Sequence, residues 1–392
     1  MADENTSTSN DRVNLVYETK VGDKSEQIEL PFKLLVLGDY TRDERSQYLD
    51  EQTPILLNAE SSSLEVLFKQ LKPELKLKVA NKLEDDDSDL LIELTFNSLD
   101  DFTPSRIIEQ HAGLKKIVEF TDTLGRSTDS ITIDLSDADK SLIESVLQVE
   151  SVSLAELQQS TESLGWLISS IENRLCEQLD EILHHPHFNA LESVWRALDF
   201  LIERTDFSEN CEIAVLNVSK QALADDFEDM PEITQSRYYQ LVYTDEFGQF
   251  GGRPYGAIIA AYELNPKASD MKLIQKIAGV SAVAHAPFIA GAAAEFFDID
   301  SYSKFSRLRD LSSIFNQPAY IKWNSFQQSD DSRYVGLTLP SFLLRESYQI
   351  EIGSLLYNEK IRDKETELVW GNSSFAFATR LLDSFAQYRW CL

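Results

Sequence analysis

The feature that most constrains this chain is a short apolar run near its start. Phe32 to Leu37 is apolar throughout except for Lys33, and the run ends at Gly38 and Asp39. A run that is apolar at both odd and even positions predicts a strand buried on both faces. The Gly-Asp pair that follows predicts a turn.

Upstream of this strand the sequence alternates between apolar and polar residues. Val13, Leu15 and Tyr17 are apolar with polar neighbours, and a similar alternation resumes over Gln27 to Leu30. This period of two predicts strands with one buried face, joined in a hairpin through Val21 to Lys24. The first of these strands comprises Arg12, Val13, Asn14, Leu15, Val16, Tyr17, Glu18 and Thr19.

Further signals complete the first half of the chain. Leu75 to Val79 and Leu90 to Phe96 flank an acidic turn, Glu84 to Asp89, and predict two antiparallel strands. Thr103 precedes Pro104, which predicts an N-cap followed by proline at the first helical position.

A change of composition divides the sequence. Residues 125–150 lose aromatic residues and gain Ser and Asp, which favours a linker. From Ser163 onward, apolar residues recur every three or four positions and predict a long helix. We therefore expect a mobile tail (1–11), an N-terminal segment (12–124), a linker (125–160) and a C-terminal segment (161–392).

The C-terminal segment alternates between helical and strand patterns. Helices are predicted over Leu191–Glu203, Gln235–Thr244, Met271–Ala284 and Phe375–Tyr388, and strands over Glu212–Val218, Tyr255–Leu264, Phe288–Ala290 and Tyr334–Leu339. The expected fold class is α/β, with two modules that contain mixed sheets and are joined by the polar linker and the long helix.

Net charge and cysteine content limit the classes of partner and the cellular compartment that are expected for this chain. The 392 residues carry a formal net charge of −30, which disfavours nucleic acid and anionic lipid surfaces and favours partners of opposite sign. The three cysteines match neither a disulfide framework nor a zinc pattern. The start of the chain lacks signal-peptide character, and no apolar run approaches the roughly 20 residues that span a bilayer. We expect a soluble, cytoplasmic protein without membrane insertion.

Histidines form the densest cluster of potential metal ligands. His184, His185 and His187 surround Pro186, and a metal site would need their imidazoles to converge with further ligands. Adjacent side chains on one turn point in different directions. We therefore favour a helix-terminus turn, in which one imidazole interacts with terminal carbonyl groups.

Three other motifs have weaker functional interpretations. The glycine-rich stretch Phe247–Gly252 lacks a phosphate-loop pattern and favours a turn before the strand that follows. Asp39 resembles a carboxylate at an α/β active site in its placement, but without a phosphate-binding glycine pair it is interpreted as a turn cap. His285 lies among small residues and is interpreted as a hydrogen-bonded core residue. We assign no residue to catalysis, to a cofactor or to a metal.

Two stretches of sequence resemble known families. The stretch RVNLVYETKVGDKSEQIELPFKLLVLGDYT, followed by LKPELKLKVANKL and ELTFNSLDDFTPSRIIEQ, resembles the small sheath subunit of type VI secretion systems, TssB or VipA. From about residue 165 the motifs RLCEQLDEILHHPHFNALESVWRALDFLIER, PYGAIIAAYEL, IAGVSAVAHAPFIAGAAAEFF and LVWGNSSFAFATRLLDSFAQYRW resemble the large subunit, TssC or VipB.

The resemblance implies a non-enzymatic part of a contractile sheath. Small and large subunits of these families pair and polymerise into a tube around an inner needle. The resemblance implies that the strand Arg12–Thr19 adds to the sheet of a neighbouring subunit. The expected partners are other sheath subunits in a homo- or hetero-oligomer, with the baseplate and the inner tube as further candidates.

Two alternatives remain open. Large subunits of this family continue beyond the position of Leu392, so the chain is alternatively expected to cap, initiate or restrain sheath growth. The alternative from another class is a metal- or nucleotide-dependent enzyme centred on the histidine turn or on the glycine-rich stretch.

Overall fold

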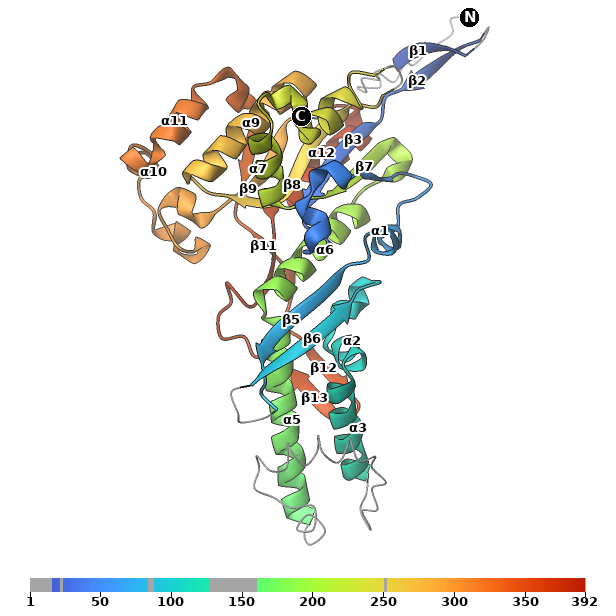
Figure 1. Cartoon of the computed structure of the whole chain (residues 1–392), viewed down its shortest axis with the longest axis vertical. Coiled ribbons are helices and arrows are strands. Elements are labelled where there is room, and N and C mark those ends of the chain that lie inside the picture. Colours follow the sequence, from blue (N-terminus) through green and yellow to red (C-terminus); the bar gives the residue numbers. More distant parts are fainter. Residues whose placement is uncertain (1–15, 22–23, 84–87, 127–160, 250–251, 392) are drawn as a thin grey trace, which may run out of the picture.

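The computed structural model describes residues 16–21, 24–83, 88–126, 161–249 and 252–391. A broad body narrows into a stalk in which α3 (Ala112–Arg126) and α5 (Thr161–Leu183) lie side by side, and a hairpin projects from the body at the opposite end (Figure 1). Helices and strands are mixed throughout, which confirms the predicted α/β class.

A six-stranded sheet forms the centre of the body, in the order β10-β9-β8-β3-β7-β4. Strands β3, β7, β8, β9 and β10 run parallel, and β4 is antiparallel to β7. The bounds are β3 Phe32–Gly38, β4 Ile55–Leu57, β7 Cys211–Asn217, β8 Tyr255–Leu264, β9 Phe288–Ala292 and β10 Val335–Thr338.

Strand β3 comes from the N-terminal segment, as β4 does, but lies between two strands of the C-terminal segment. It pairs with β7 along one edge and with β8 along the other. The side chains from Leu34 to Leu37 are fully buried, which confirms the predicted two-sided burial. The two segments that the sequence separates therefore share one sheet.

Helices cover both faces of this sheet. Leu34 and Val36 point into a core that includes residues of α6 (Pro186–Glu203) and α12 (Ser373–Tyr388). Leu35 and Leu37 point into a second core, against α7 (Lys220–Asp229) and α9 (Ala268–Ala284). Successive side chains of a strand point to opposite faces, so a single apolar run serves both cores.

The stalk side of the body is built around a second pair of strands. β5 (Glu74–Ala80) and β6 (Asp89–Thr95) are antiparallel, as predicted. In β5 the leucines and the valine are buried while the charged residues between them are exposed, and the strand contacts α5. Short elements complete the described fold: α1 Leu64–Leu71, α2 Pro104–Gln110, α8 Arg237–Tyr239, α10 Leu311–Phe315, α11 Ile321–Gln327, β11 Phe342–Arg345, β12 Gln349–Ile352, β13 Leu355–Asn358 and β14 Val369–Gly371.

Several predicted boundaries differ from the observed ones. The helix predicted from Leu191 begins at Pro186, because Pro fits the first helical position and His185 caps the helix. The single helix predicted over Gln235–Thr244 is instead a succession of short 3-10, α and π turns. Thr103 and Pro104 occupy the predicted cap and first position of α2. The predicted tail (1–11) and most of the predicted linker (125–160) lie outside the described residues.

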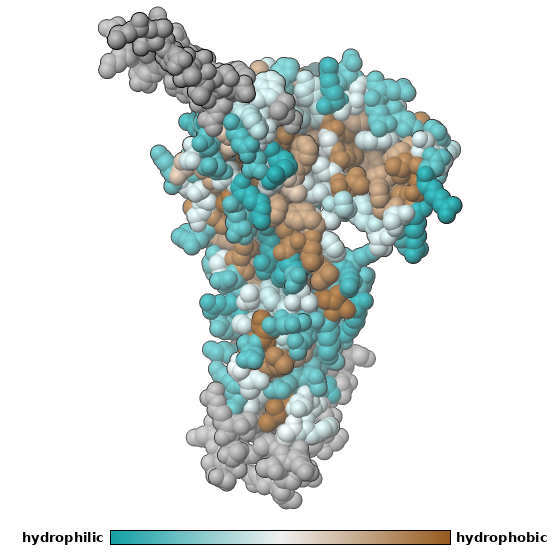
Figure 2. Space-filling view, turned by 180° about the vertical axis from the view of Figure 1, so that it is seen from behind, coloured by the Kyte–Doolittle hydropathy of each residue, from teal (hydrophilic) through white to brown (hydrophobic). Residues whose placement is uncertain are grey.

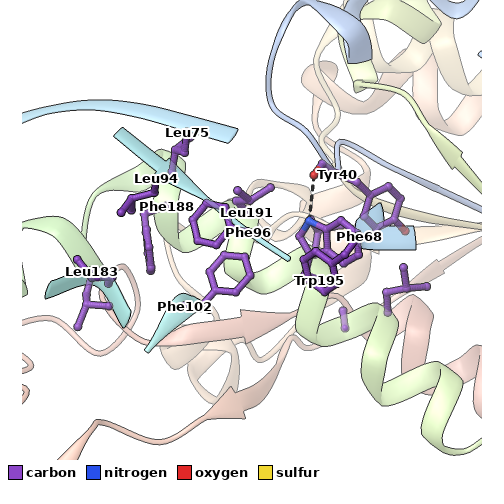
Figure 3. Close-up of a cluster of buried hydrophobic side chains, with 14 of the residues drawn as sticks. Tyr40, Phe68, Leu75, Leu94, Phe96, Phe102, Leu183, Phe188, Leu191 and Trp195 are labelled. Carbon is purple, nitrogen blue, oxygen red and sulfur yellow. Dashed lines mark hydrogen bonds between the residues drawn. The ribbon is translucent and has the colours of Figure 1, made fainter. Parts of the chain in front are cut away.

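An aromatic cluster joins the two segments in the first core (Figure 3). The rings of Phe68, from α1, and Trp195, from α6, stack with centroids 3.8 Å apart. The Trp195 indole Nε1–H donates to the Tyr40 carbonyl oxygen at 2.9 Å, so this buried polar group is satisfied. Phe96 and Phe102 stack next to Phe188 in the same cluster. Packing therefore ties the N-terminal segment to α6 as well as to the sheet.

The shared sheet predicts how the chain behaves when it is divided. Residues 1–126 and 161–392, expressed as two polypeptides in one cell, should copurify as a stable complex, because β3 has to pair with β7 and β8. Residues 161–392 expressed alone should aggregate, since β7 and β8 would then expose the edges that β3 covers. Size-exclusion chromatography and circular dichroism check both outcomes. A folded, monomeric 161–392 fragment would contradict the shared core.

Candidate assembly site

The hairpin that projects from the body contains half of the predicted interaction strand. β1 (Val16–Val21) and β2 (Lys24–Glu29) are antiparallel, with Val16 opposite Glu29 and Val21 opposite Lys24. The predicted hairpin is therefore confirmed. Residues 12–15 of the predicted strand lie outside the described residues, as do residues 22 and 23 of the turn.

Each strand of the hairpin pairs with one strand only. Within the described residues β1 and β2 form a separate two-stranded sheet, so each has one edge without a strand partner. Such edges are templates for pairing with another chain. Only two residues separate β2 from β3, so the hairpin is a direct extension of the central strand of the body.

The register indicates which amides face the free edge of β1. Two residues separate Val21 from Lys24, and residues that flank a two-residue loop form a hydrogen-bonded pair. Hydrogen-bonded and non-hydrogen-bonded pairs alternate along an antiparallel ladder. We therefore expect the amide of Glu18 to point away from β2, toward an incoming strand, and the amide of Thr19 to point toward β2.

A buried ion-pair cluster fixes strands near the C-terminus to α5 and α6. Arg345, at the end of β11, donates from Nε to Glu192 of α6 at 2.9 Å and from Nη1 to Glu359 at 2.7 Å. The side chain of Arg345 is 8% exposed and both carboxylates are fully buried. Tyr357 of β13 donates its hydroxyl to Asp180 of α5 at 2.7 Å. Breaking such a pair leaves an uncompensated buried charge, so the cluster holds β11–β13 against α5 and α6.

The electrostatics of this cluster favour the charged forms. Burial by itself raises the pKa of Glu359, but its hydrogen bonds with His184, Arg345 and the Tyr348 amide lower the pKa to about 2. The pKa of Arg345 rises although burial opposes its charge, because Glu359 and Glu192 face the guanidinium. Glu359 is therefore ionised across the neutral pH range.

The histidine turn lies between α5 and α6, as predicted, but its contacts differ from the prediction. His184 places Nε2 3.2 Å from Glu359 Oε1 and Nδ1 3.8 Å from Glu367 Oε2. His185 Nδ1 accepts the amide N–H of His187 at 3.2 Å. The predicted contact with terminal carbonyls is wrong, because Pro186 starts a new helix whose free N–H groups need acceptors. Among the described residues, no group of three or more His, Cys, Asp or Glu side chains could hold a metal ion.

The other predicted motifs have structural roles. Asp39 Oδ1 accepts the Arg42 amide at 2.8 Å, which confirms the turn cap. His285 is exposed, and its left-handed backbone (φ 52°) ends α9, so the core interpretation is wrong. The amides of Phe247 and Gly248 donate to the Tyr243 carbonyl and form a turn ahead of β8, as expected.

Comparison with known protein families shows to which families this chain belongs. Residues 166–392 match the model of the VipB family, described as EvpB/VC_A0108, tail sheath N-terminal domain. Residues 6–162 match the model of a second family, described as type VI secretion system, VipA, VC_A0107 or Hcp2. The chain belongs to the type VI secretion sheath families. It joins a VipA-like and a VipB-like part in one polypeptide.

Two relatives from Pseudomonas aeruginosa agree with this division. The type VI secretion system sheath protein TssC1 is 35% identical over 258 residues, which is 64% of this chain and 51% of TssC1. The sheath protein TssB1 is 24% identical over 108 residues, which is 28% of this chain and 62% of TssB1. The matched regions thus span about half of TssC1 and less than two thirds of TssB1.

Two further observations concern the cysteines and the helices of the chain. Its three cysteines are free, and burial raises the pKa of Cys176 to about 11 and that of Cys211 to about 12. Thiols of this kind are poor nucleophiles at neutral pH. None of the helices within the described ranges combines the length and the apolar character that a membrane span needs.

Sequence reasoning missed the ion-pair cluster. Glu192, Arg345 and Glu359 are far apart in the chain, and each resembles an ordinary surface charge in its local context. One available signal was the position of Glu192 on the apolar face of α6, between Leu191 and Val194.

Glu359 gives a prediction about acid stability. Its pKa is about 2 in the folded protein and near 4.5 when unfolded, so its contribution is fully present above about pH 5 and is lost as pH falls toward 2. Glu359→Gln should lower the free energy of unfolding by about 3 kcal/mol at pH 7. Urea denaturation, followed by circular dichroism, should show this difference shrinking between pH 5 and pH 3.

The exposed Glu60 supplies the matched control. Glu60→Gln should change the free energy of unfolding by less than about 0.5 kcal/mol at each pH. A Glu359→Gln difference that is the same at pH 7 and pH 3 would show that the carboxylate is not stabilised by its partners.

Proposed function

We propose that this chain is a structural component of a type VI secretion sheath or of a sheath-like assembly. One observation carries the proposal: β3, from the VipA-like part, is a central strand that lies between β7 and β8 of the VipB-like part. In a fused chain the VipA-like and VipB-like parts are present in a fixed ratio of one to one. The proposed role of the chain is assembly rather than catalysis.

The hairpin supports the proposed mode of assembly. Its free edges project from the body, and β2 leads directly into β3. A strand from a neighbouring copy that pairs with β1 would therefore be connected through the backbone to the centre of the next sheet. The proposed interaction strand is Arg12–Thr19, of which Val16–Thr19 lie in β1. Main-chain hydrogen bonds would supply most of this contact.

The surface offers further contact area. Figure 2 shows apolar residues gathered over the body and continuing toward the stalk on the face turned away in Figure 1. Large apolar side chains are exposed on the described surface, among them Tyr48, Leu91, Trp166, Ile321 and Leu356. Exposed apolar area of this kind is typical of interaction surfaces. The proposed partners are other sheath subunits, with the baseplate and the inner tube as further candidates.

Electron microscopy of the purified chain tests the proposed function. The chain alone, or mixed with an ordinary pair of small and large sheath subunits, should form tubes or rings or should bind to tubes. Binding confined to tube ends would identify a capping role within the same assembly. Particles that stay dispersed and leave the tubes of the mixture unchanged would contradict a sheath role.

Substitution of Glu18 tests the strand addition. Glu18→Pro removes an amide that we expect to face the incoming strand, while β2 keeps its own hydrogen bonds to β1. It should lower the fraction of chain that pellets as assemblies at least about tenfold, since the incoming strand loses a ladder hydrogen bond and meets the proline ring at that position. Sedimentation and electron microscopy measure this fraction.

Glu18→Ala is the matched control. It removes the same side chain and keeps the amide, so it should assemble like the original chain. Equal loss with Ala and Pro would indicate a side-chain contact instead of strand addition, and normal assembly of Glu18→Pro would contradict the role of β1.

A further inference from the structure

A cavity of about 340 Å³ lies at the carboxyl ends of the central strands. Residues that end or follow three parallel strands line it: Asp39 and Arg42 after β3, Ser219 and Lys220 after β7, and Tyr262 and Glu263 at the end of β8. Both the VipA-like and the VipB-like parts contribute to its walls. The volume is within the range of small-molecule sites.

The cavity lies at the edge of the sheet where its parallel strands end. The chain leaves β3 toward the face that α7 covers, where Leu49 is buried, and forms β4 before α5 and α6 lead to β7. Helix α6, which forms part of the cavity wall, covers the other face. Ligands of open α/β sheets bind outside the carboxyl ends of the strands.

Arg42 supplies a cationic group that pairs with no carboxylate of the described residues. Its Nε is buried without a hydrogen-bond partner, and no ion pair joins its guanidinium to a carboxylate within the described part of the chain. The backbone of Arg42 is left-handed (φ 51°), a conformation that side chains other than Gly rarely adopt. Asp39 Oδ1 holds this turn by accepting the Arg42 amide. Such backbone strain clusters at ligand sites.

The other basic side chain of the cavity is already paired, and the acidic side chains of the cavity disfavour a ligand with two negative charges. Lys220 Nζ lies 3.0 Å from Asp270 Oδ2, so its charge is neutralised. Glu263 accepts a hydrogen bond from Ser341, and burial raises the pKa of Glu263. With Asp39 and Glu263 in the same wall, a phosphate dianion would meet like charge.

The remaining wall is mainly apolar. It includes Val194 and Ala197 of α6, Ala261 of β8, Trp370 of β14 and Phe375 of α12. Its polar side chains Ser193 and Asn372 already donate to the carbonyl oxygens of Trp370 and Tyr262. A largely apolar wall beside a guanidinium that no described carboxylate pairs with suits a ligand that has an apolar body and a single carboxylate, because Arg binds a carboxylate through two parallel hydrogen bonds.

We propose that this cavity, the Arg42 pocket, binds an organic carboxylate through the Arg42 guanidinium. The carboxylate belongs either to a free organic acid or to an acidic side chain of a neighbouring copy of this chain. The two sources share the same chemistry at Arg42. The pocket goes beyond the proposed sheath role and does not depend on it.

Titration calorimetry and thermal unfolding of the full chain at constant ionic strength test the pocket. Benzoate should bind saturably and raise the melting temperature, acetate should bind more weakly, and inorganic phosphate should bind least. Arg42→Gln should weaken benzoate binding at least about tenfold, since the bidentate pair is lost. Arg309→Gln, which changes an exposed arginine outside the pocket, should bind benzoate like the original chain.

Two measurements keep the test decisive if Arg42→Gln folds poorly. Arg42→Lys keeps the charge and loses the planar fork, so it should bind benzoate with intermediate affinity. A crystal of the original chain soaked with benzoate should show the carboxylate against Arg42. The absence of saturable binding, equal binding by Arg42→Gln, or phosphate binding as tight as that of benzoate would overturn the proposal.

An assembly experiment distinguishes the two sources of the carboxylate. If an acidic side chain of a neighbouring copy occupies the pocket, saturating benzoate should reduce the amount of sedimenting assembly several-fold. If a free organic acid is the ligand, benzoate should leave assembly unchanged while it still binds. Because benzoate binding is measured by heat and melting temperature and the sheath role by assembly, a failure of one is distinguishable from a failure of the other.

Discussion

The whole molecule depends on the position of β3 between β7 and β8. An interior strand that is apolar on both faces and paired along both edges cannot be removed without exposing two hydrophobic cores and two rows of backbone hydrogen-bonding groups. The VipA-like part is therefore an integral component of the VipB-like sheet. Fusion in one polypeptide makes this strand pairing intramolecular, with the effective concentration that a covalent link provides.

The same strand determines where the other features lie. Toward its start, β3 continues into the hairpin whose free edge is the proposed assembly element. At its end, the turn at Asp39 places Arg42 in the cavity at the carboxyl ends of the parallel strands. The ion pairs of Arg345 then hold β11 and the segment that follows β13 against α6, which covers β3. A pull on the hairpin would accordingly be transmitted to a buried central strand of the body.

Local patterns in the sequence predicted the elements but could not predict how they combine. The apolar run Phe32–Leu37 and the alternation of Leu75–Val79 each identify a strand, because burial on two faces or on one face leaves a distinct periodicity. The position of β3 inside the second segment is a non-local pairing across more than 170 residues, and no periodicity encodes it. No periodicity encodes the ion pairs of Arg345 either, because the paired residues are far apart in the chain. The position of Arg42 in a cavity depends on a left-handed turn and on the strands around it, which the local sequence does not predict. The contacts of the histidine turn and the burial of His285 were misjudged because a helix begins after His185 and another ends at His285, and such boundaries depend on tertiary contacts.

Native-state hydrogen exchange tests the shared sheet most directly. Amides of β3 should exchange with the same free energy of opening as those of β7 and β8, because the three strands can separate only when the body unfolds as a unit. If the amides of β3 instead exchanged earlier, together with those of β5 and β6, the VipA-like part would be an independently unfolding domain, and the account of one common sheet would be wrong.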